Sequence, residues 1–128
     1  MFSHVTVGTN DFAKARKFYA AVMAALGHKA MMDADGLIAY GEPTGPKFFV
    51  LPPFDKNKAT VGNGSHTAFI CDTREKVDAF YKAALDNGGA DEGAPGPRPH
   101  YHPNYYGAYV RDPDGNKLQA VCHKKPGV

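Results

Sequence analysis

The alternation of apolar and polar side chains predicts a strand, a helix and three further strands in the first half of the chain. Residues 2–8 alternate as a half-buried strand does, with His4 and Thr6 on one face. Apolar side chains then recur at helical spacing from Phe12 to Leu26. Three later stretches are interpreted as strands: residues 29–32, 36–40 and 47–51. The first half is therefore expected to fold as a βαβββ unit.

The helix ends have the residues that such ends require. Asn10 or Asp11 offers a side-chain oxygen to the free backbone N–H groups at the start of the first helix. Gly27 is suited to the left-handed conformation that ends it. In the second half, Thr73 and the pair Gly88-Gly89 occupy the corresponding places around a second helix. Both helices therefore have a predicted beginning and end.

The second half repeats the order of the first. Residues 65–71 are expected to form a strand, residues 90–92 a weak strand and residues 93–104 a long loop. A shift of 62 positions superposes similar residues: His4 on His66, Lys14 on Lys76, Phe18 on Phe80, Tyr19 on Tyr81, Ala21 on Ala83 and Gly27 on Gly89. Chance is the alternative, because a Phe-Tyr pair followed by glycine is common on helices. The histidine pair at the same offset favours a true repeat.

A hairpin closes the second half. Strands are expected over residues 105–111 and 117–122, joined by the sequence DPDGN from Asp112 to Asn116. Proline, aspartate and glycine in this order are typical of a tight turn. On the returning strand, Gln119 lies on the face opposite Leu118. A polar amide between apolar neighbours is unusual and marks this strand as a candidate site.

Composition narrows the function classes. The chain of 128 residues is long enough for one domain with a hydrophobic core. A net charge of +2 from scattered basic residues argues against nucleic-acid binding. No membrane-length apolar run or signal peptide is recognisable, so we expect no membrane insertion and a cytoplasmic protein. Cys71 and Cys122 lack CxxC spacing and are expected to be reduced thiols.

The final hairpin with DPDGN, together with the N-terminal segment HVTVGTNDFAKARKFYAAVMAALG, resembles the glyoxalase, bleomycin-resistance and extradiol-dioxygenase superfamily, the vicinal oxygen chelate fold. The resemblance implies an α+β fold of two βαβββ modules that form a half-open barrel around a cavity. It implies one glyoxalase-like domain over residues 1–128, made of repeats 2–52 and 65–122. It also implies a small-molecule ligand and a homodimer, which exposed aromatics such as Tyr105 and Tyr106 favour.

In metal-dependent members of this superfamily, two histidines and two acidic or similar residues hold the ion. The resemblance carries these positions to His4, His66 and Gln119, with Phe49 at the fourth place. Such a set would suit a divalent metal, namely Zn, Ni, Fe or Mn. Gln119 and Phe49 depart from the pattern, because neither supplies a negative charge or a general base. The alternative is that both histidines are hydrogen-bonded cavity residues.

The proline-rich segment from Pro97 to Tyr106 is the second candidate site. Prolines stiffen it, so its side chains can be held in place at low entropic cost. Arg98 would bind a carboxylate or phosphate, and tyrosines would contact an aromatic ligand. The predicted substrate-binding residues are therefore Arg98, His100, Tyr101, Tyr105, Tyr106 and Phe49. The alternative is a rigid surface loop that packs on a partner subunit.

Three functions remain in view, and the third, after the two described next, is an accessory domain that binds a protein. The first is a glyoxalase-like protein that binds or acts on a small organic molecule at an atypical metal site. Its chemistry would then be that of a lyase or isomerase, such as lactoylglutathione lyase, or of a dioxygenase. The second is a metal-free, bleomycin-resistance-like protein that sequesters a drug or metabolite. The absence of acidic ligands favours binding, whereas the histidine pair favours an enzyme.

Overall fold

The computed structural model describes residues 1–127. The first module contains β1 (His4–Gly8), α1 (Phe12–Ala25), β2 (Ala30–Ala34), β3 (Leu37–Gly41) and β4 (Lys47–Leu51). The second contains β5 (Thr67–Cys71), α2 (Arg74–Asp86), β6 (Ala90–Pro97), β7 (Tyr106–Arg111) and β8 (Lys117–Cys122). The predicted βαβββ order is thus confirmed in both halves. In this described part, no helix is long and apolar enough to cross a membrane.

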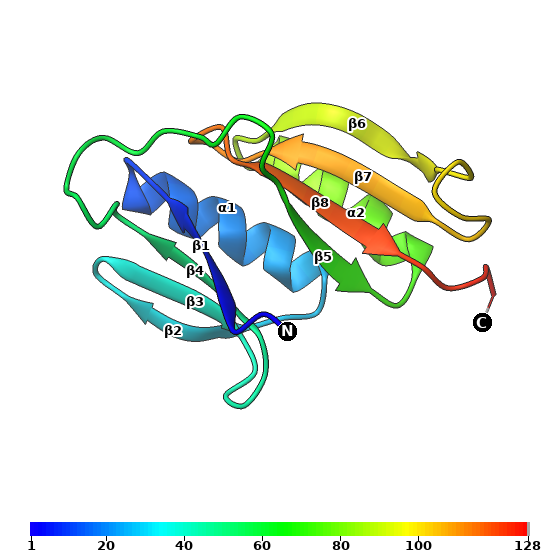
Figure 1. The fold of residues 1–128 in the computed structure, drawn as a ribbon, viewed down its shortest axis with the longest axis horizontal. Helices are drawn as coiled ribbons and strands as arrows, with labels where there is room; N and C mark the ends of the chain where they lie inside the picture. The colour runs from blue at the N-terminus through cyan, green and yellow to red at the C-terminus, as the bar shows by residue number, and fades with distance from the viewer. Residues whose placement is uncertain (128) are drawn as a thin grey trace.

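Each module forms a four-stranded mixed sheet. The strand orders are β1-β4-β3-β2 and β5-β8-β7-β6, so the first strand of each module pairs in parallel with its last. The remaining pairs are antiparallel. Figure 1 shows the two modules side by side, with β1 and β5 as the strands nearest the middle of the molecule. The fold is therefore a duplicated α+β unit.

The pairing of the first and last strands is the same in both modules at the predicted ligand positions. Thr6 of β1 pairs with Phe49 of β4, and Ala68 of β5 pairs with Gln119 of β8. Phe49 and Gln119 are therefore structural equivalents, as expected from the resemblance, which assigned both to ligand positions. Paired residues in a sheet point to the same face, so each lies on the face that also contains the histidine of its module.

Aromatic rings join the modules on the helix side of the sheets. The ring centroids of Phe48 and Phe69 are 5.0 Å apart, and those of Phe69 and Phe80 are 6.3 Å apart. Tyr19 of α1 contacts Phe48 at 5.3 Å, and α1 also packs on α2. These side chains belong to one buried cluster drawn from both modules. The cluster leaves the opposite face of each sheet available for function.

The predicted helix ends are confirmed. The Asp11 side chain accepts a hydrogen bond from the Lys14 backbone N–H, and Thr73 does the same for Lys76. Gly27 follows α1 with φ of 89°. Of the two capping candidates for α1, the structure selects Asp11, because Asn10 instead exchanges hydrogen bonds with the backbone of Ala59.

Several predicted boundaries were wrong. β1 begins at His4, not at residue 2, and β5 begins at Thr67, not at residue 65. β2 covers residues 30–34 and not 29–32.

The largest difference is in β6, which extends to Pro97, so the long loop begins at Arg98. The β6–β7 register shifts between Asp91 and Gly93 and again before Gly96. Prolines and glycines are tolerated there because β6 is an edge strand and can bulge. The irregular composition therefore concealed most of this strand.

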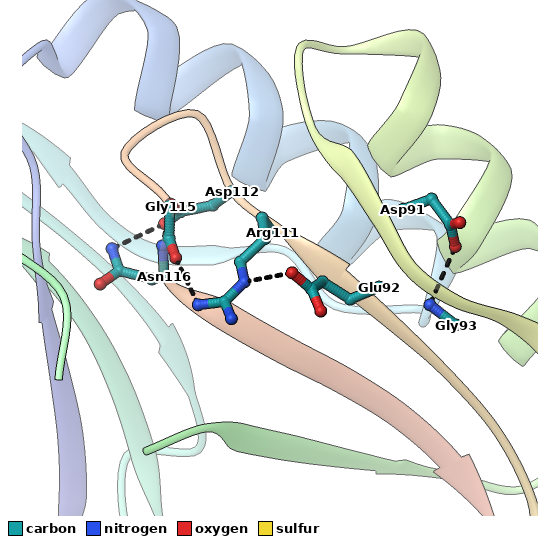
Figure 2. Close-up of polar contacts among 7 residues, drawn as sticks. All are labelled: Asp91, Glu92, Gly93, Arg111, Asp112, Gly115 and Asn116. Carbon is teal, nitrogen blue, oxygen red and sulfur yellow. Dashed lines mark hydrogen bonds and ion pairs between the residues drawn. The ribbon is translucent and has the colours of Figure 1, made fainter. Parts of the chain in front are cut away.

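The DPDGN turn ties the second module to the first. One carboxylate oxygen of Asp112 accepts from the backbone N–H groups of Asp114 and Asn116. The other accepts from the Tyr19 hydroxyl of α1 and from Asn116 Nδ2, which also donates to Gly8 O of β1 at 3.0 Å. Figure 2 shows Asn116 turned toward Asp112, and Arg111 turned toward Glu92. Burial raises the pKa of Asp112 although these hydrogen bonds oppose the rise. The motif therefore has a structural role.

Candidate functional site

The candidate site lies on the face of the second sheet that points away from α2. Alternation along β7 and β8 places Leu118 and Val110 in the core and puts Gln119 and Tyr109 on the other face, directly opposite each other. We call this the open face and define it by five residues: His66, Tyr105, Tyr109, Lys117 and Gln119. Aromatic side chains cover Gln119 so fully that it is 1% exposed.

Gln119 stands at the centre of a hydrogen-bonded network. Its Nε2 donates to the Tyr105 hydroxyl, so its Oε1 is the acceptor for His66 Nε2 at 3.2 Å. His66 Nε2 must therefore carry the hydrogen in this arrangement. A Cβ at Gly107 would come within 3.0 Å of Gln119 Nε2, which explains why a glycine occupies that place in β7. The network holds the His66 and Tyr105 rings in fixed positions.

Tyr109 extends the network over β8. Its ring lies 5.7 Å from the His66 ring, and desolvation, together with the neighbouring Tyr105 and Tyr101 phenols, raises its pKa far above the ordinary value for tyrosine. Its hydroxyl is thus protonated at neutral pH and remains a hydrogen-bond donor. Tyr101 stacks at a tilt on Tyr105 with a centroid separation of 4.8 Å. Three phenols therefore gather beside Gln119.

The first module offers a different surface at the equivalent positions. His4 contacts the edge of Phe49 with ring centroids 5.2 Å apart, and its Nδ1 lies 2.8 Å from Ser3 Oγ. Ala39 pairs with Phe49 where Tyr109 pairs with Gln119 in the second module. The structure thus brings His4 to Phe49 and His66 to Gln119, as two pairs on separate sheets.

The segment from Arg98 to Tyr106 divides between two faces. Tyr101 and Tyr105 join the open face, and Arg98 reaches Tyr109 with its guanidinium 5.9 Å from the ring centroid. His100 stacks on Tyr101 at 4.2 Å and is exposed. Tyr106 points the other way, because its hydroxyl donates to Asp78 of α2 and its ring lies under Arg74. The structure therefore does not bring Tyr106 together with the other predicted residues.

One expectation about exposure needs correction. Tyr105 and Tyr106, expected to be exposed aromatics, are half-buried. His123 is exposed just after β8 and has a partner: its Nδ1 lies 2.8 Å from His102 Nε2. Both imidazoles also pack on Tyr105. The polar aromatic cluster is therefore larger than the sequence indicated.

A hollow of about 510 Å³ lies over the end of the first sheet. It is lined by Thr6, Gly8 and Leu51 of the sheet and by residues 52–55 and 58–60 of the segment that follows β4. It contains none of the predicted site residues, although Thr6 pairs with Phe49. A ligand there would thus meet a mixed surface, in which the prolines and Phe54 lie beside Asp55 and Lys58.

Comparison with known proteins identifies the fold family. Residues 1–120 match the model of the Glyoxalase/Bleomycin resistance protein/Dioxygenase superfamily. The chain belongs to this superfamily. A glyoxalase/bleomycin resistance protein from Albidiferax ferrireducens T118 is similar over nearly its whole length, with 39% identity, coverage of 97% of this chain and 99% of that one, and a TM-score of 0.88. The predicted resemblance is confirmed.

Other solved members share the fold at lower identity. A glyoxalase-related enzyme from Fulvimarina pelagi is 19% identical, with coverage of 95% and 87% and a TM-score of 0.73. A lactoylglutathione lyase from Agrobacterium tumefaciens is 18% identical, with coverage of 94% and 92% and a TM-score of 0.64. At these identities the likeness supports the fold alone. No curated protein matches the sequence.

Superfamily members are often metal-dependent, and the residues here do not fit a resident divalent cation. Across residues 1–127, no three His, Cys, Asp or Glu side chains form a group that would hold one. His66 Nε2 donates to Gln119 Oε1, so this nitrogen has no lone pair for an ion, and the amide oxygen already accepts one hydrogen bond. Phe49 supplies no ligand at the fourth position. Neutral donors alone leave the charge of such an ion uncompensated.

Sequence reasoning missed Tyr109 and Lys117 as parts of the open face, and Gly107 as the residue that leaves room for Gln119. A signal was present, because counting outward from the DPDGN turn pairs Arg111 with Lys117 and then Tyr109 with Gln119. Antiparallel partners share a face, so this count alone would have placed Tyr109 beside the unusual amide. The segment rich in polar and aromatic residues drew attention away from the strand that follows it.

Proposed function

We propose that this protein binds a small organic molecule on the open face of the second module without a resident metal ion. This is the function of a bleomycin-resistance-like binding protein. The observation that carries it is the Gln119 network, in which both ends of the amide are occupied by His66 and Tyr105. A residue committed in this way orients its neighbours and is unsuited to ligate an ion or to accept a proton from a substrate.

The chemistry of the face favours recognition of a planar or aromatic ligand. Tyrosine rings supply large contact areas, lose little entropy on binding, and carry hydroxyls that give direction. Here Tyr101, Tyr105 and Tyr109 are held by one another and by the Gln119 amide before any ligand arrives. Such preorganisation lowers the entropic cost of binding.

A matched pair of variants tests this function. The assay is an NMR-detected screen of small aromatic acids, alcohols and amines in the presence of EDTA. Tyr105→Phe and Tyr106→Phe each remove one hydroxyl, from opposite faces of β7. We expect Tyr105→Phe to weaken binding by about threefold or more, as for one lost hydrogen bond, and Tyr106→Phe to leave it unchanged. Equal effects of the two variants, or binding that requires added metal, would contradict the proposal.

A metal-dependent lyase, isomerase or dioxygenase is the second candidate. It is favoured by His4 and His66, which occupy equivalent positions of the two modules, each next to the residue at the ligand position of its last strand. Calorimetric titration with Zn²⁺, Ni²⁺, Fe²⁺ and Mn²⁺ separates the two functions. Tight binding lost on replacement of either histidine would favour the enzyme.

We also propose that the protein is a homodimer. Ile70 lies within β5 and is 71% exposed, and Met32 in β2 is 47% exposed. Apolar side chains of this size in regular strands are commonly covered in an assembly. Light scattering over a wide concentration range tests this, and a monomer throughout would refute it.

A further inference from the structure

We infer that the ligand of the open face is a small organic anion, whose carboxylate, phosphate or phosphonate group is bound by Arg98 and Lys117 beside Tyr109. The inference rests on the proposed binding face and adds the charge of its ligand. Both cations lie near the same ring: Arg98 Cζ is 5.9 Å and Lys117 Nζ is 5.1 Å from the Tyr109 centroid. Arg98 precedes β7 and Lys117 begins β8, so the fold brings both of them to the same tyrosine.

Arg98 is held in place by the backbone of β6. Its Nη1 donates to Gly96 O at 2.8 Å and its Nη2 donates to Ala94 O at 2.9 Å. A Cβ at Gly96 would lie 3.3 Å from Nη1, and one at Gly93 would lie 3.5 Å from Nη2, so the glycines leave room for the guanidinium. These two bonds leave further N–H donors of the fork for a ligand. The backbone of β6 thus holds the positively charged Arg98 guanidinium in one position.

Neither cation is neutralised by an acidic side chain in the described part of the chain. The four ion pairs there involve other residues. Glu92, the acid on the neighbouring strand, is engaged by Arg111 at 2.8 Å, as Figure 2 shows. Arg98 and Lys117 therefore keep their charges available. Half-buried cations without a counter-ion are natural partners for an anion, and the bidentate geometry of arginine suits an oxyanion.

Hydrogen-bond donors accompany the charge. Tyr109 keeps its proton at neutral pH because burial and neighbouring phenols raise its pKa. The Tyr105 hydroxyl accepts from Gln119 Nε2 and also lies beside the Tyr109 hydroxyl, so one phenol can donate to the other while the second donates to a ligand. An oxyanion near Tyr109 would thus meet two charged donors and at least one neutral one.

The same geometry argues against a cationic ligand. Clustered tyrosines attract quaternary ammonium groups through the negative faces of their rings. Here Arg98 and Lys117 already make cation–π contacts with the Tyr109 ring. Their positive charges would repel a further cation. The aromatic cluster therefore supports the rings of an anionic ligand and is closed to a positively charged one.

The first module provides a matched control. Lys47 pairs with Gly41 as Lys117 pairs with Arg111, but its Nζ donates to Gly45 O at 2.9 Å. Ala39 replaces Tyr109 there. Lys47→Gln therefore removes the same charge at the equivalent place, without touching the proposed ligand site.

The experiment compares probes of one shape and different charge. Benzoate and phenylphosphonate serve as anions, benzyl alcohol as the neutral probe and benzyltrimethylammonium as the cation, with binding followed by amide chemical shifts. We expect the anions to bind at least about tenfold more tightly than the alcohol, and Arg98→Gln and Lys117→Gln each to weaken anion binding about fivefold. Lys47→Gln should change it less than about twofold. Circular dichroism verifies that each variant is folded.

The outcomes separate this inference from the function on which it rests. If the alcohol or the ammonium probe binds as tightly as benzoate, or if Arg98→Gln and Lys117→Gln leave anion affinity unchanged, the anion site is refuted and small-molecule binding stands. If no probe perturbs the open face, both fail. Anion binding that falls equally in all three charge variants is general electrostatic attraction and also refutes the site.

Discussion

The two modules share one backbone and differ in what their open faces present. Equivalent positions hold Phe49 and Gln119 on the last strands, and Ala39 and Tyr109 on the strands beside them. Each histidine contacts the residue at the equivalent position, an apolar ring in one module and an amide in the other. A duplicated scaffold thus maintains geometry in both copies, while polar recognition chemistry is concentrated in one.

The turns before the last strands show the same division. EPTGP from Glu42 to Pro46 corresponds to DPDGN from Asp112 to Asn116, and in both turns the glycine N–H donates to the backbone oxygen of the acid. Glu42 is exposed, whereas Asp112 is 4% exposed and accepts from Tyr19 of the other module. One copy of the turn closes a hairpin, and the other also joins the modules.

The largest effect is therefore expected from Asp112→Ala. It removes the acceptor for the Tyr19 hydroxyl, for two backbone N–H groups and for Asn116 Nδ2, in a buried place. Donors left unsatisfied in this way should lower the free energy of unfolding by about 3 kcal/mol. Urea denaturation followed by circular dichroism measures the loss.

Glu42→Ala is its control at the equivalent position. Its side chain is exposed, so the change should stay within about 0.5 kcal/mol of the wild type. Comparable losses in the two variants would mean that the DPDGN turn is no more than a hairpin connection, and that the modules are held together by their core alone.

Tyr19 of α1 and Tyr81 of α2 are equivalent in the two modules, so their variants compare the stability that each hydroxyl provides. Tyr19→Phe removes a hydroxyl that is buried against Asp112, whereas Tyr81→Phe removes one that donates to Asp91 at the surface. We expect a loss of about 1.5 kcal/mol for the first and less than about 0.5 kcal/mol for the second. Neither variant creates a cavity, so the difference reports the hydrogen bond. Thermal unfolding of both proteins would reveal it, and equal midpoints would show that the buried bond adds no stability.

The fold was largely predictable because its signals are local and occur twice. Helix caps, glycines and alternation recur at one offset, so each half supported the interpretation of the other. β6 was predicted only over residues 90–92, because the rest of the strand depends on pairing with β7, which the prolines and glycines of its own sequence conceal. The role of Asp112 also depends on a distant partner, Tyr19, which no local pattern indicates.

The candidate site was less predictable because it is assembled by pairing. The resemblance directed attention to His66 and Gln119, which the structure joins. It could not place Tyr109 and Lys117 near Arg98, since these contacts depend on the irregular course of β6. Tyr106 was included from composition, and alternation along β7 directs it to α2 instead.

Replacing Gln119 by Glu tests whether the second module retains the geometry of a metal site. A carboxylate beside His66 adds the anionic oxygen that the wild type lacks, on a side chain of the same length. The affinity for Zn²⁺, Ni²⁺ or Mn²⁺ should rise at least about tenfold, or about 1.4 kcal/mol, as measured by titration calorimetry. Without metal the variant should be less stable, because the carboxylate is desolvated at a buried position.

Phe49→Glu is the matched change in the first module, where the carboxylate would lie beside His4. If neither variant binds metal, the histidines have a structural role or belong to the ligand surface. If Phe49→Glu gains as much affinity as Gln119→Glu, the contrast between the two faces does not extend to metal binding.

The smallest effect concerns pH and has a sign that can be worked out. Burial raises the folded-state pKa of Asp112 above its ordinary value of 3.8, so the folded protein binds this proton more tightly than the unfolded chain. Its contribution to stability is then complete below pH 3.8 and is lost as the pH rises through the folded-state pKa. The free energy of unfolding of the wild type relative to Asp112→Asn should therefore fall as the pH rises through this window.

Asp72 provides the comparison of opposite sign, because the hydrogen bond and charge of Lys76 lower the pKa of Asp72. The free energy of unfolding of the wild type relative to Asp72→Asn should therefore rise with pH. Stability curves of the three proteins by urea denaturation from acid to neutral pH measure both slopes. A wild-type advantage over Asp112→Asn that grows with pH would mean that the bonds from Tyr19 and Asn116 outweigh burial, and that the turn joining the modules is organised around a charged carboxylate.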